Sequence, residues 1–313
     1  MIDIFTTVID NFGDAGYSLR LAKYLNENYE KTRILTDNKE IFFQLDDQIL
    51  FDVIEMIDLK DDYKSSEKII FMFQFFPEKI FLKSINKNKS KCITIDYFTP
   101  EKWAVDSNNT QAYHKEIKTK NIFLVPGIYE KSAGILKYIQ TEDKKNNFHN
   151  IYLYSPEKIC AFLKEEIILW GNKDILATNI KKMPILPQKY FDSYLIGAKF
   201  NWIRGEDSFQ LALNSGIPFF WEAYKQKNKV HHLKVTAYLN FMKNFFDSKE
   251  IYNNYKNIIL YLNDYDLKID FEKNFMFLER EYIKLQKVFI SLKEYFQKIK
   301  SLQENLIENF EIM

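Results

Sequence analysis

Short apolar segments alternate with amphipathic segments along this chain, and the alternation constrains its fold more than any other feature. Ile2–Val8 has the composition of a buried strand. Residues 17–29 place Leu21 and Leu25 on one face of a helix. Further strands are expected at Thr32–Thr36, Ile69–Phe75, Cys92–Asp96 and Ile122–Val125. Strands that alternate with helices predict a mostly parallel sheet covered on both faces.

A polar, charged segment at residues 138–150 interrupts the alternation, which then restarts. A length of 313 residues also favours two domains. In the second half we expect strands at Ile151–Tyr154, Ile175–Thr178, Phe200–Ile203 and Ile217–Trp221, and helices at residues 156–166 and 207–214. The pattern predicts two α/β domains, over residues 1–145 and 146–277.

The region 278–313 has a different pattern. From Leu278 to Ile299, apolar residues recur at alternating spacings of four and three, with Lys and Glu between them. This spacing predicts a long amphipathic helix. We expect it to pack along the domains, because the pattern breaks after Ile299; a coiled-coil dimer is the alternative.

The composition narrows the function classes. Hydrophobic residues make up 46%, charged residues 28%, and the net charge is +1, which argues against disorder and against a nucleic-acid partner. Two cysteines and four histidines offer neither a disulfide framework nor a zinc motif. The longest apolar run, Ile69–Phe76, is too short to span a membrane. We expect a cytoplasmic protein without a membrane partner and without a metal.

The loop DNFGDAG, residues 10–16, follows the first predicted strand and opens the first predicted helix. Ligands of open α/β sheets bind at the carboxyl ends of strands, so this loop lies where chemistry is expected. It is neither GxGxxG nor a P-loop. Its two carboxylates, Asp10 and Asp14, are candidates for acid–base work, although an acid near a helix start can also be a cap.

The segment RGEDS, residues 204–208, also joins a predicted strand to a predicted helix. A helix start beside Arg204 suits a phosphate or diphosphate. Glu206 and Asp207 look contradictory at an anion site unless one caps the helix and the other accepts a sugar hydroxyl. A capped structural helix with an Arg–Asp pair is the alternative.

A third cluster, PILPQKYFD at residues 184–192, combines groups that suit a base. Gln188 offers a donor and an acceptor for a pyrimidine edge, and Phe191 offers a stacking face. Tyr152 and Tyr154 share one side of a predicted strand, and the sequence leaves open which of them lines a ligand. Asp264-Tyr265-Asp266 resembles a metal-binding DxD, but we expect a plain loop there.

Together these motifs resemble one family, the elongation factor P arginine rhamnosyltransferases. DNFGDAG is similar to that family's DNFGDIG, and NWIRGEDSF at residues 201–209 to its NFVRGEDSF. PILPQKYFD resembles PFVPQxx(F/Y)D, and GIPFFW at residues 216–221 resembles GxPFVW. The similarity runs from about residue 3 to 241. Departures include Ala15 for Ile and Ile185 for a base-stacking aromatic.

The resemblance implies a GT-B fold, dTDP-β-L-rhamnose as donor on the second domain and elongation factor P as acceptor on the first. It also implies inversion at the anomeric carbon without a metal. The implied catalytic residues are Asp10, Asp14 and Glu206. The implied nucleotide-sugar contacts are Phe12, Gly13, Tyr154, Gln188, Phe191, Arg204, Asp207 and Ser208.

Two other functions remain open at this point. One is a GT-B glycosyltransferase with another nucleotide-sugar donor or a small-molecule acceptor. The other is a non-catalytic protein that binds a nucleotide or a partner. A screen of dTDP, UDP and GDP sugars separates the first from the rhamnosyltransferase, and donor consumption excludes the second.

Overall fold

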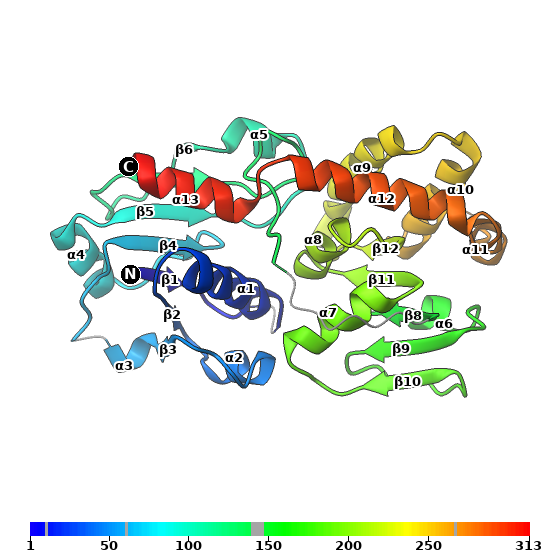
Figure 1. Cartoon of the computed structure of the whole chain (residues 1–313), viewed down its shortest axis with the longest axis horizontal. Helices are drawn as coiled ribbons and strands as arrows, with labels where there is room; N and C mark the ends of the chain where they lie inside the picture. Colours follow the sequence, from blue (N-terminus) through cyan, green and yellow to red (C-terminus); the bar gives the residue numbers. More distant parts are fainter. Residues whose placement is uncertain (10–11, 60–61, 139–146, 266–267) are drawn as a thin grey trace. The chain divides into compact units, whose positions relative to one another are not determined.

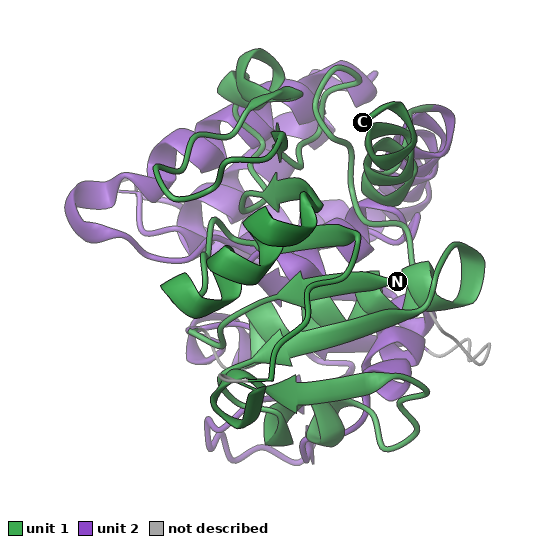
Figure 2. Ribbon diagram, turned by 90° about the vertical axis from the view of Figure 1, so that its left-hand side faces the viewer, with its two compact units in different colours: residues 1–138, 299–313 green, residues 139–298 purple. Residues whose placement is uncertain are grey.

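The computed structural model describes residues 1–9, 12–59, 62–138, 147–265 and 268–313. The chain forms two compact units (Figure 1, Figure 2). Unit 1 comprises residues 1–138 and 299–313, and unit 2 comprises residues 139–298. Within the described ranges, no helix is both long enough and apolar enough to cross a membrane.

Unit 1 is built on a seven-stranded sheet in the order β3-β2-β1-β4-β5-β7-β6. Among the described strands of this sheet, β6 alone pairs antiparallel, with β7. The strands are β1 (Ile2–Phe5), β2 (Thr32–Thr36), β3 (Asp52–Glu55), β4 (Lys68–Met72), β5 (Lys91–Ile95), β6 (Thr110–Gln111) and β7 (Asn121–Leu124). The strand order reverses between β1 and β4, and such a switch point is where open α/β sheets bind ligands.

Both faces of this sheet are apolar, as the unbroken hydrophobic runs predict for a covered parallel sheet. Ile4, Ile34 and Ile70 share a core with helices α1, α2 and α13. Phe5 and Phe71 pack on the opposite face against α4. The helices of unit 1 are α1 (Phe12–Asn28), α2 (Glu40–Leu45), α3 (Met56–Leu59), α4 (Lys79–Asn88), α5 (Trp103–Ser107) and α13 (Leu302–Ile312).

Unit 2 holds a five-stranded, fully parallel sheet in the order β10-β9-β8-β11-β12. Its strands are β8 (Phe148–Ile151), β9 (Glu166–Trp170), β10 (Ile180–Met183), β11 (Phe200–Arg204) and β12 (Phe219–Glu222). Its helices are α6 (Glu157–Cys160), α7 (Gln188–Gly197), α8 (Asp207–Leu213), α9 (His231–Met242), α10 (Lys249–Leu262), α11 (Phe271–Arg280) and α12 (Tyr282–Lys298). The switch point of this sheet lies between β8 and β11.

The expected single helix over residues 278–313 is wrong in detail. Its span contains the end of α11, all of α12, and α13, which begins after a break at residues 299–301. Ser301 causes the restart, because its side chain accepts the Glu304 N–H while the Glu304 carboxylate accepts the Ser301 N–H. The helix α13 then packs beside α1 in unit 1 (Figure 1, Figure 2).

Several local predictions also need correction. Ile175–Thr178 is not a strand, and Leu176 within it is 99% exposed. The helix expected over residues 156–166 is the short α6, because the chain soon enters β9, a strand that the sequence did not predict. β8 ends at Ile151, so Tyr152 and Tyr154 lie in the loop beyond it. The strand β3 was also missed, because it is a partly exposed edge strand with an acid at each end.

Candidate active site

In unit 1, the candidate residues follow β1 at the switch point. Asp14 lies in the first turn of α1, is 4% exposed, and accepts the backbone N–H of Ile9 at Oδ2, 3.0 Å away. The positive end of the helix dipole favours a carboxylate at this position. Phe12 and Gly13 begin the same helix and are half-buried. Asp10 lies outside the described residues.

Further hydrogen bonds hold the segment between β1 and Asp14. The Val8 N–H donates to Asp37 Oδ1 across 3.0 Å, and the Ser18 hydroxyl of α1 donates to Thr6 Oγ1 across 3.1 Å. The loop is therefore tied both to α1 and to the segment after β2. A carboxylate held in this way keeps a fixed orientation, which general-base catalysis requires.

In unit 2, the candidate residues gather around Arg204 at the carboxyl end of β11. The Arg204 guanidinium carbon lies 4.4 Å from the ring centroid of Tyr152 and 4.4 Å from that of Tyr154. Its Nη2 also donates to the Tyr152 hydroxyl at 3.1 Å. Both tyrosines follow β8, so the switch point brings them to Arg204. Both tyrosines therefore contact the arginine, and which of them lines a ligand stays a prediction.

Glu222 supports this arrangement, and sequence reasoning missed it. It ends β12, opposite Arg204 in the parallel register, and is fully buried. Its Oε2 accepts the N–H groups of Tyr154 at 2.7 Å and Ser155 at 3.1 Å. Burial raises the pKa of Glu222, while the two N–H donors act in the opposite direction. An acid closing an otherwise apolar strand beside Arg204 was the available signal.

The rest of RGEDS turns sharply after Arg204. Gly205 has φ +67°, a conformation that glycine adopts without strain, and its carbonyl accepts the Trp221 indole N–H at 2.8 Å. Glu206 precedes α8 without a side-chain capping bond and pairs with Lys234 at 2.6 Å. Asp207 and Ser208 form the first turn of α8. Of the two acids, Glu206 therefore makes no capping bond, and its carboxylate faces a lysine of α9.

One aromatic side chain, Phe191, connects the predicted base-binding cluster at residues 184–192 to the side chains around Arg204. Phe191, in α7, makes edge contacts with Tyr152 at 5.6 Å and with Trp170 at 5.2 Å between ring centroids. Gln188 begins α7 and is 6% exposed. Ile185, in the loop before them, is 57% exposed. Phe191, Tyr154 and Arg204 thus lie within one connected set of side chains.

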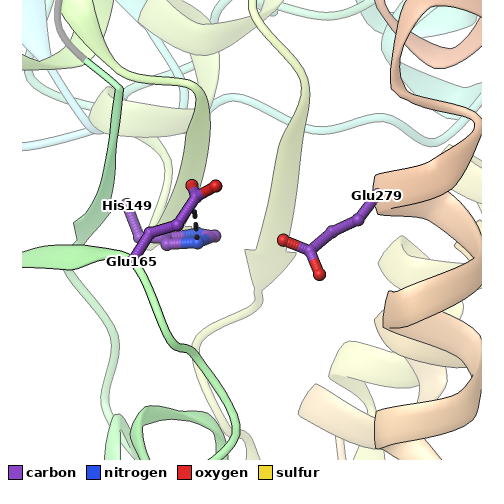
Figure 3. A group of neighbouring side chains, drawn as sticks. All are labelled: His149, Glu165 and Glu279. Carbon is purple, nitrogen blue, oxygen red and sulfur yellow. Dashed lines mark ion pairs between the residues drawn. The ribbon is translucent and has the colours of Figure 1, made fainter.

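One group of side chains has the composition of a metal site: His149, Glu165 and Glu279 (Figure 3). The Trp202 indole N–H, however, donates to His149 Nδ1 at 3.2 Å. Because indole can only donate, the proton of the neutral imidazole must sit on Nε2, the atom that faces Glu165. Burial, with Lys199 nearby, lowers the pKa of His149 to about 3. A protonated Nε2 has no lone pair for a metal, so His149 is not a ligand in this tautomer.

The second metal lookalike is also engaged otherwise. Asp264 pairs with Lys158 and, at 2.6 Å, with Lys225, and these lysines lower its pKa against the opposing effect of burial. Asp266 lies outside the described residues. The adjacent His232 stacks on Tyr265, with ring centroids 3.9 Å apart. Asp264 therefore belongs to a lysine–carboxylate cluster.

Comparisons with a family model and with known relatives point to the same family. The family model described as elongation factor P (EF-P) rhamnosyltransferase EarP matches residues 2–154 and 155–311. A protein-arginine rhamnosyltransferase from Pseudomonas aeruginosa is 20% identical, and the match covers 76% of this chain and 80% of that relative.

Solved structures agree on the fold. The structure that explains EarP-mediated arginine glycosylation of translation elongation factor EF-P superposes with a TM-score of 0.64 at 15% identity, covering 99% of this chain and 98% of that one. Spinosyn rhamnosyltransferase SpnG, complexed with thymidine diphosphate, gives a TM-score of 0.56 at 8% identity, covering 99% of this chain and all of that one. The fold is that of the GT-B glycosyltransferases.

Proposed function

This chain belongs to the elongation factor P rhamnosyltransferase family, and we propose that it transfers L-rhamnose from dTDP-β-L-rhamnose to an arginine of elongation factor P. One observation supports the proposal: the family match runs through both units, and each unit has a charged candidate side chain after a strand at its own switch point. Asp14 marks the first of these points and Arg204 the second.

On the acceptor side, the nucleophile is a guanidinium nitrogen. Arginine has a pKa above about 12, so the group is protonated at rest, and a carboxylate cannot remove the proton fully before the reaction. We assign Asp14 to accept this proton as the new C–N bond forms. Its fixed orientation, set by the Ile9 N–H, supports that role. Asp10 is assigned to orient the guanidinium beside it.

On the donor side, the bond from the anomeric carbon to the diphosphate breaks, and the leaving diphosphate takes the electron pair. Arg204 is assigned to this anion, because its guanidinium is held between two tyrosine rings and needs little reorganisation. Asp207 and Ser208 are assigned to the same side. Since α8 has only seven residues, the charge of Arg204 matters more than the helix dipole.

The other assignments complete the donor site. Gln188 and Phe191 would contact the thymine, and Tyr154, which contacts Arg204, would lie beside the nucleotide. Phe12 and Gly13 are assigned to the sugar. Glu206 is the third essential acid, and its ion pair with Lys234 fixes its carboxylate. We propose that the transfer needs no metal, since Arg204 supplies the positive charge that a metal would bring to the diphosphate.

The test is the intact mass of elongation factor P after incubation with this protein and dTDP-β-L-rhamnose. The expected result is a gain of one deoxyhexose, mapped to an arginine by fragmentation. Parallel reactions with UDP- and GDP-sugars establish the donor. If donor binds and is not transferred to elongation factor P under any condition, the proposed acceptor is wrong.

A further inference from the structure

A group of aromatic side chains occupies the switch point of unit 1, next to the first candidate loop. The rings of Phe73 and Tyr97 stack with centroids 4.4 Å apart and planes inclined by 14°. Phe73 also contacts Tyr17, at 5.8 Å between centroids. We call Tyr17, Phe73 and Tyr97 the aromatic platform. Phe73 follows β4 and Tyr97 follows β5, so both lie at the carboxyl edge of the sheet.

The backbone beneath the platform is strained. Phe73 and Gln74 are consecutive non-glycine residues in the left-handed region, with φ +55° and +58°. Side chains with a Cβ rarely adopt this conformation. Here the surroundings impose it, because the Gln74 N–H donates to the Ile95 carbonyl and the Phe75 N–H donates to the Met72 carbonyl. Backbone strain of this kind is common at functional sites.

Tyr97 is held firmly, and part of its side chain remains open to solvent. Its backbone N–H donates to Asp96 Oδ1 at 2.8 Å, and the Asp96 N–H in turn donates to the Leu124 carbonyl at 3.0 Å. Asp96 is 9% exposed, whereas Tyr97 is 37% exposed. An aromatic ring that is fixed in place and still partly exposed can receive a flat ligand.

The platform starts beside the candidate base. Tyr17 follows Asp14 by three residues in α1, so the two side chains lie on the same face of that helix, one turn apart. Tyr17 is 4% exposed, so it connects Asp14 to the platform, while Tyr97, at 37%, is the ring that a planar cation would contact. The ring attracts the cation through its quadrupole, and the carboxylate attracts it from the edge.

We propose that Tyr97 is a specificity-determining residue that holds the guanidinium of the acceptor arginine against the aromatic platform. This inference rests on the proposed function and names the acceptor subsite within it. A guanidinium is flat and stacks on aromatic rings, whereas a lysine ammonium is a compact, strongly hydrated charge. The platform therefore favours arginine over lysine. Because stacking stabilises the cation before it loses its proton, Tyr97 acts on acceptor binding more than on the chemical step.

Steady-state kinetics with elongation factor P test this role. Tyr97→Ala should raise the acceptor KM about tenfold, the size of a cation–π contact, and leave kcat within about twofold. Tyr97→Phe should keep nearly the wild-type KM, because the ring is retained. Tyr113→Ala is the matched control, since Tyr113 is an 87% exposed tyrosine of the same unit and should have no effect. An unchanged acceptor KM for Tyr97→Ala would overturn the proposal.

A second readout separates stacking from a structural role. Phenylalanine and its mono-, di- and trifluorinated analogues at position 97 weaken the ring quadrupole step by step while keeping its shape. The logarithm of the acceptor KM should rise steadily along this series, and a flat series would contradict a cation–π contact. The affinity for dTDP should stay constant throughout.

The two proposals can fail separately. If the wild type transfers rhamnose to arginine but substitutions at position 97 leave the acceptor KM unchanged, the proposed function is retained and the platform assignment is wrong. If the wild type transfers nothing, NMR titration with N-acetyl-arginine amide and N-acetyl-lysine amide decides the platform by itself. Binding of the arginine compound alone, lost in Tyr97→Ala, supports it, and equal or absent binding of both compounds overturns it.

Discussion

The two units order their first five strands in the same way and present opposite chemistry at the same point of that order. In each sheet the order of the parallel strands reverses once, between β1 and β4 in unit 1 and between β8 and β11 in unit 2. Unit 1 places the Asp14 carboxylate there, beside an aromatic platform. Unit 2 places the Arg204 guanidinium there, between two tyrosines.

The contrast teaches what each switch point is suited to bind. A carboxylate with aromatic rings complements a cation, and a fixed guanidinium complements an anion. A reaction that joins an arginine to a sugar leaving a diphosphate has one substrate of each kind. The topology gives each unit a switch point, and the side chains after the strands determine whether that point carries negative or positive charge.

The largest expected effect is on the acid of unit 1. Asp14→Asn should lower kcat about a thousandfold, because an amide keeps the shape and the acceptor oxygen but cannot take up a proton at this pH. Asp37→Asn is the matched control, since Asp37 also accepts an N–H of the same loop and should keep its turnover. Single-turnover rates with donor bound give the measurement. Near-normal turnover in folded Asp14→Asn would remove the base assignment.

The next effect concerns the guanidinium of unit 2. Arg204→Lys should weaken dTDP binding about tenfold to a hundredfold, because lysine keeps the charge but loses the planar contact with Tyr152 and Tyr154. Calorimetric titration with dTDP measures this. Arg280→Lys, at an exposed arginine of the same unit, should bind as the wild type does. Equal affinity in both variants would break the comparison, since the planar guanidinium of Arg204 would then contribute nothing to anion binding.

A third prediction concerns how the stability of unit 2 depends on pH. The pKa of His149 is about 3 in the folded chain against 6.5 for an ordinary histidine, so below pH 6.5 the unfolded chain binds a proton that the folded chain refuses. The free energy of unfolding of unit 2 should therefore fall by about 1.4 kcal/mol per pH unit, or about 2 kcal/mol from pH 6.5 to pH 5.

Tryptophan fluorescence follows this loss, because Trp170, Trp202 and Trp221 lie in unit 2 and Trp103 alone lies in unit 1. Denaturant melts at pH 7 and pH 5 should differ in the wild type. They should differ less in His149→Phe, which has no proton to bind at this site. A pH-independent wild type would show that Glu165, Glu279 and Lys199, which surround the imidazole, offset its proton.

The smallest expected effect falls on unit 1. Ser301→Ala removes the side chain that begins α13 and should cost about 1 kcal/mol of stability. The unfolding midpoint of unit 1 should drop, while the tryptophan signal of unit 2 should change little. Ser248→Ala, which removes the cap of α10 in unit 2, should give the reverse result. Equal shifts in both signals would mean that the units unfold together.

Both strand–loop–helix junctions were predictable from the sequence because they rest on local patterns. An apolar run that ends in DNFGDAG, or in RGEDS, places those residues at a carboxyl end whatever the rest of the chain does. The strands that formed mostly apolar runs, such as β1 and β4, are confirmed. Ile175–Thr178 failed because four apolar or small residues do not show whether a neighbouring strand is there to pair with them.

The sequence alone could not predict the contacts between distant segments. Glu206 pairs with Lys234, and Arg204 contacts Tyr152 fifty-two residues earlier in the chain. Such pairs depend on which strands become neighbours, and only the strand order settles that. Phe73 carried no signal at all, since an apolar residue after a strand ordinarily joins the core, and the left-handed backbone that turns it toward Tyr97 is set by tertiary contacts.

The position of α13 has a consequence for how the protein is made. Leu302, Leu306 and Phe310 belong to the core of unit 1, yet they are synthesised after all of unit 2. Unit 1 can therefore complete its core only after all of unit 2 has been synthesised. A chain truncated near residue 298 would combine a second unit that has all its residues with a first unit that lacks part of its core, a species exposed to chaperones and proteases.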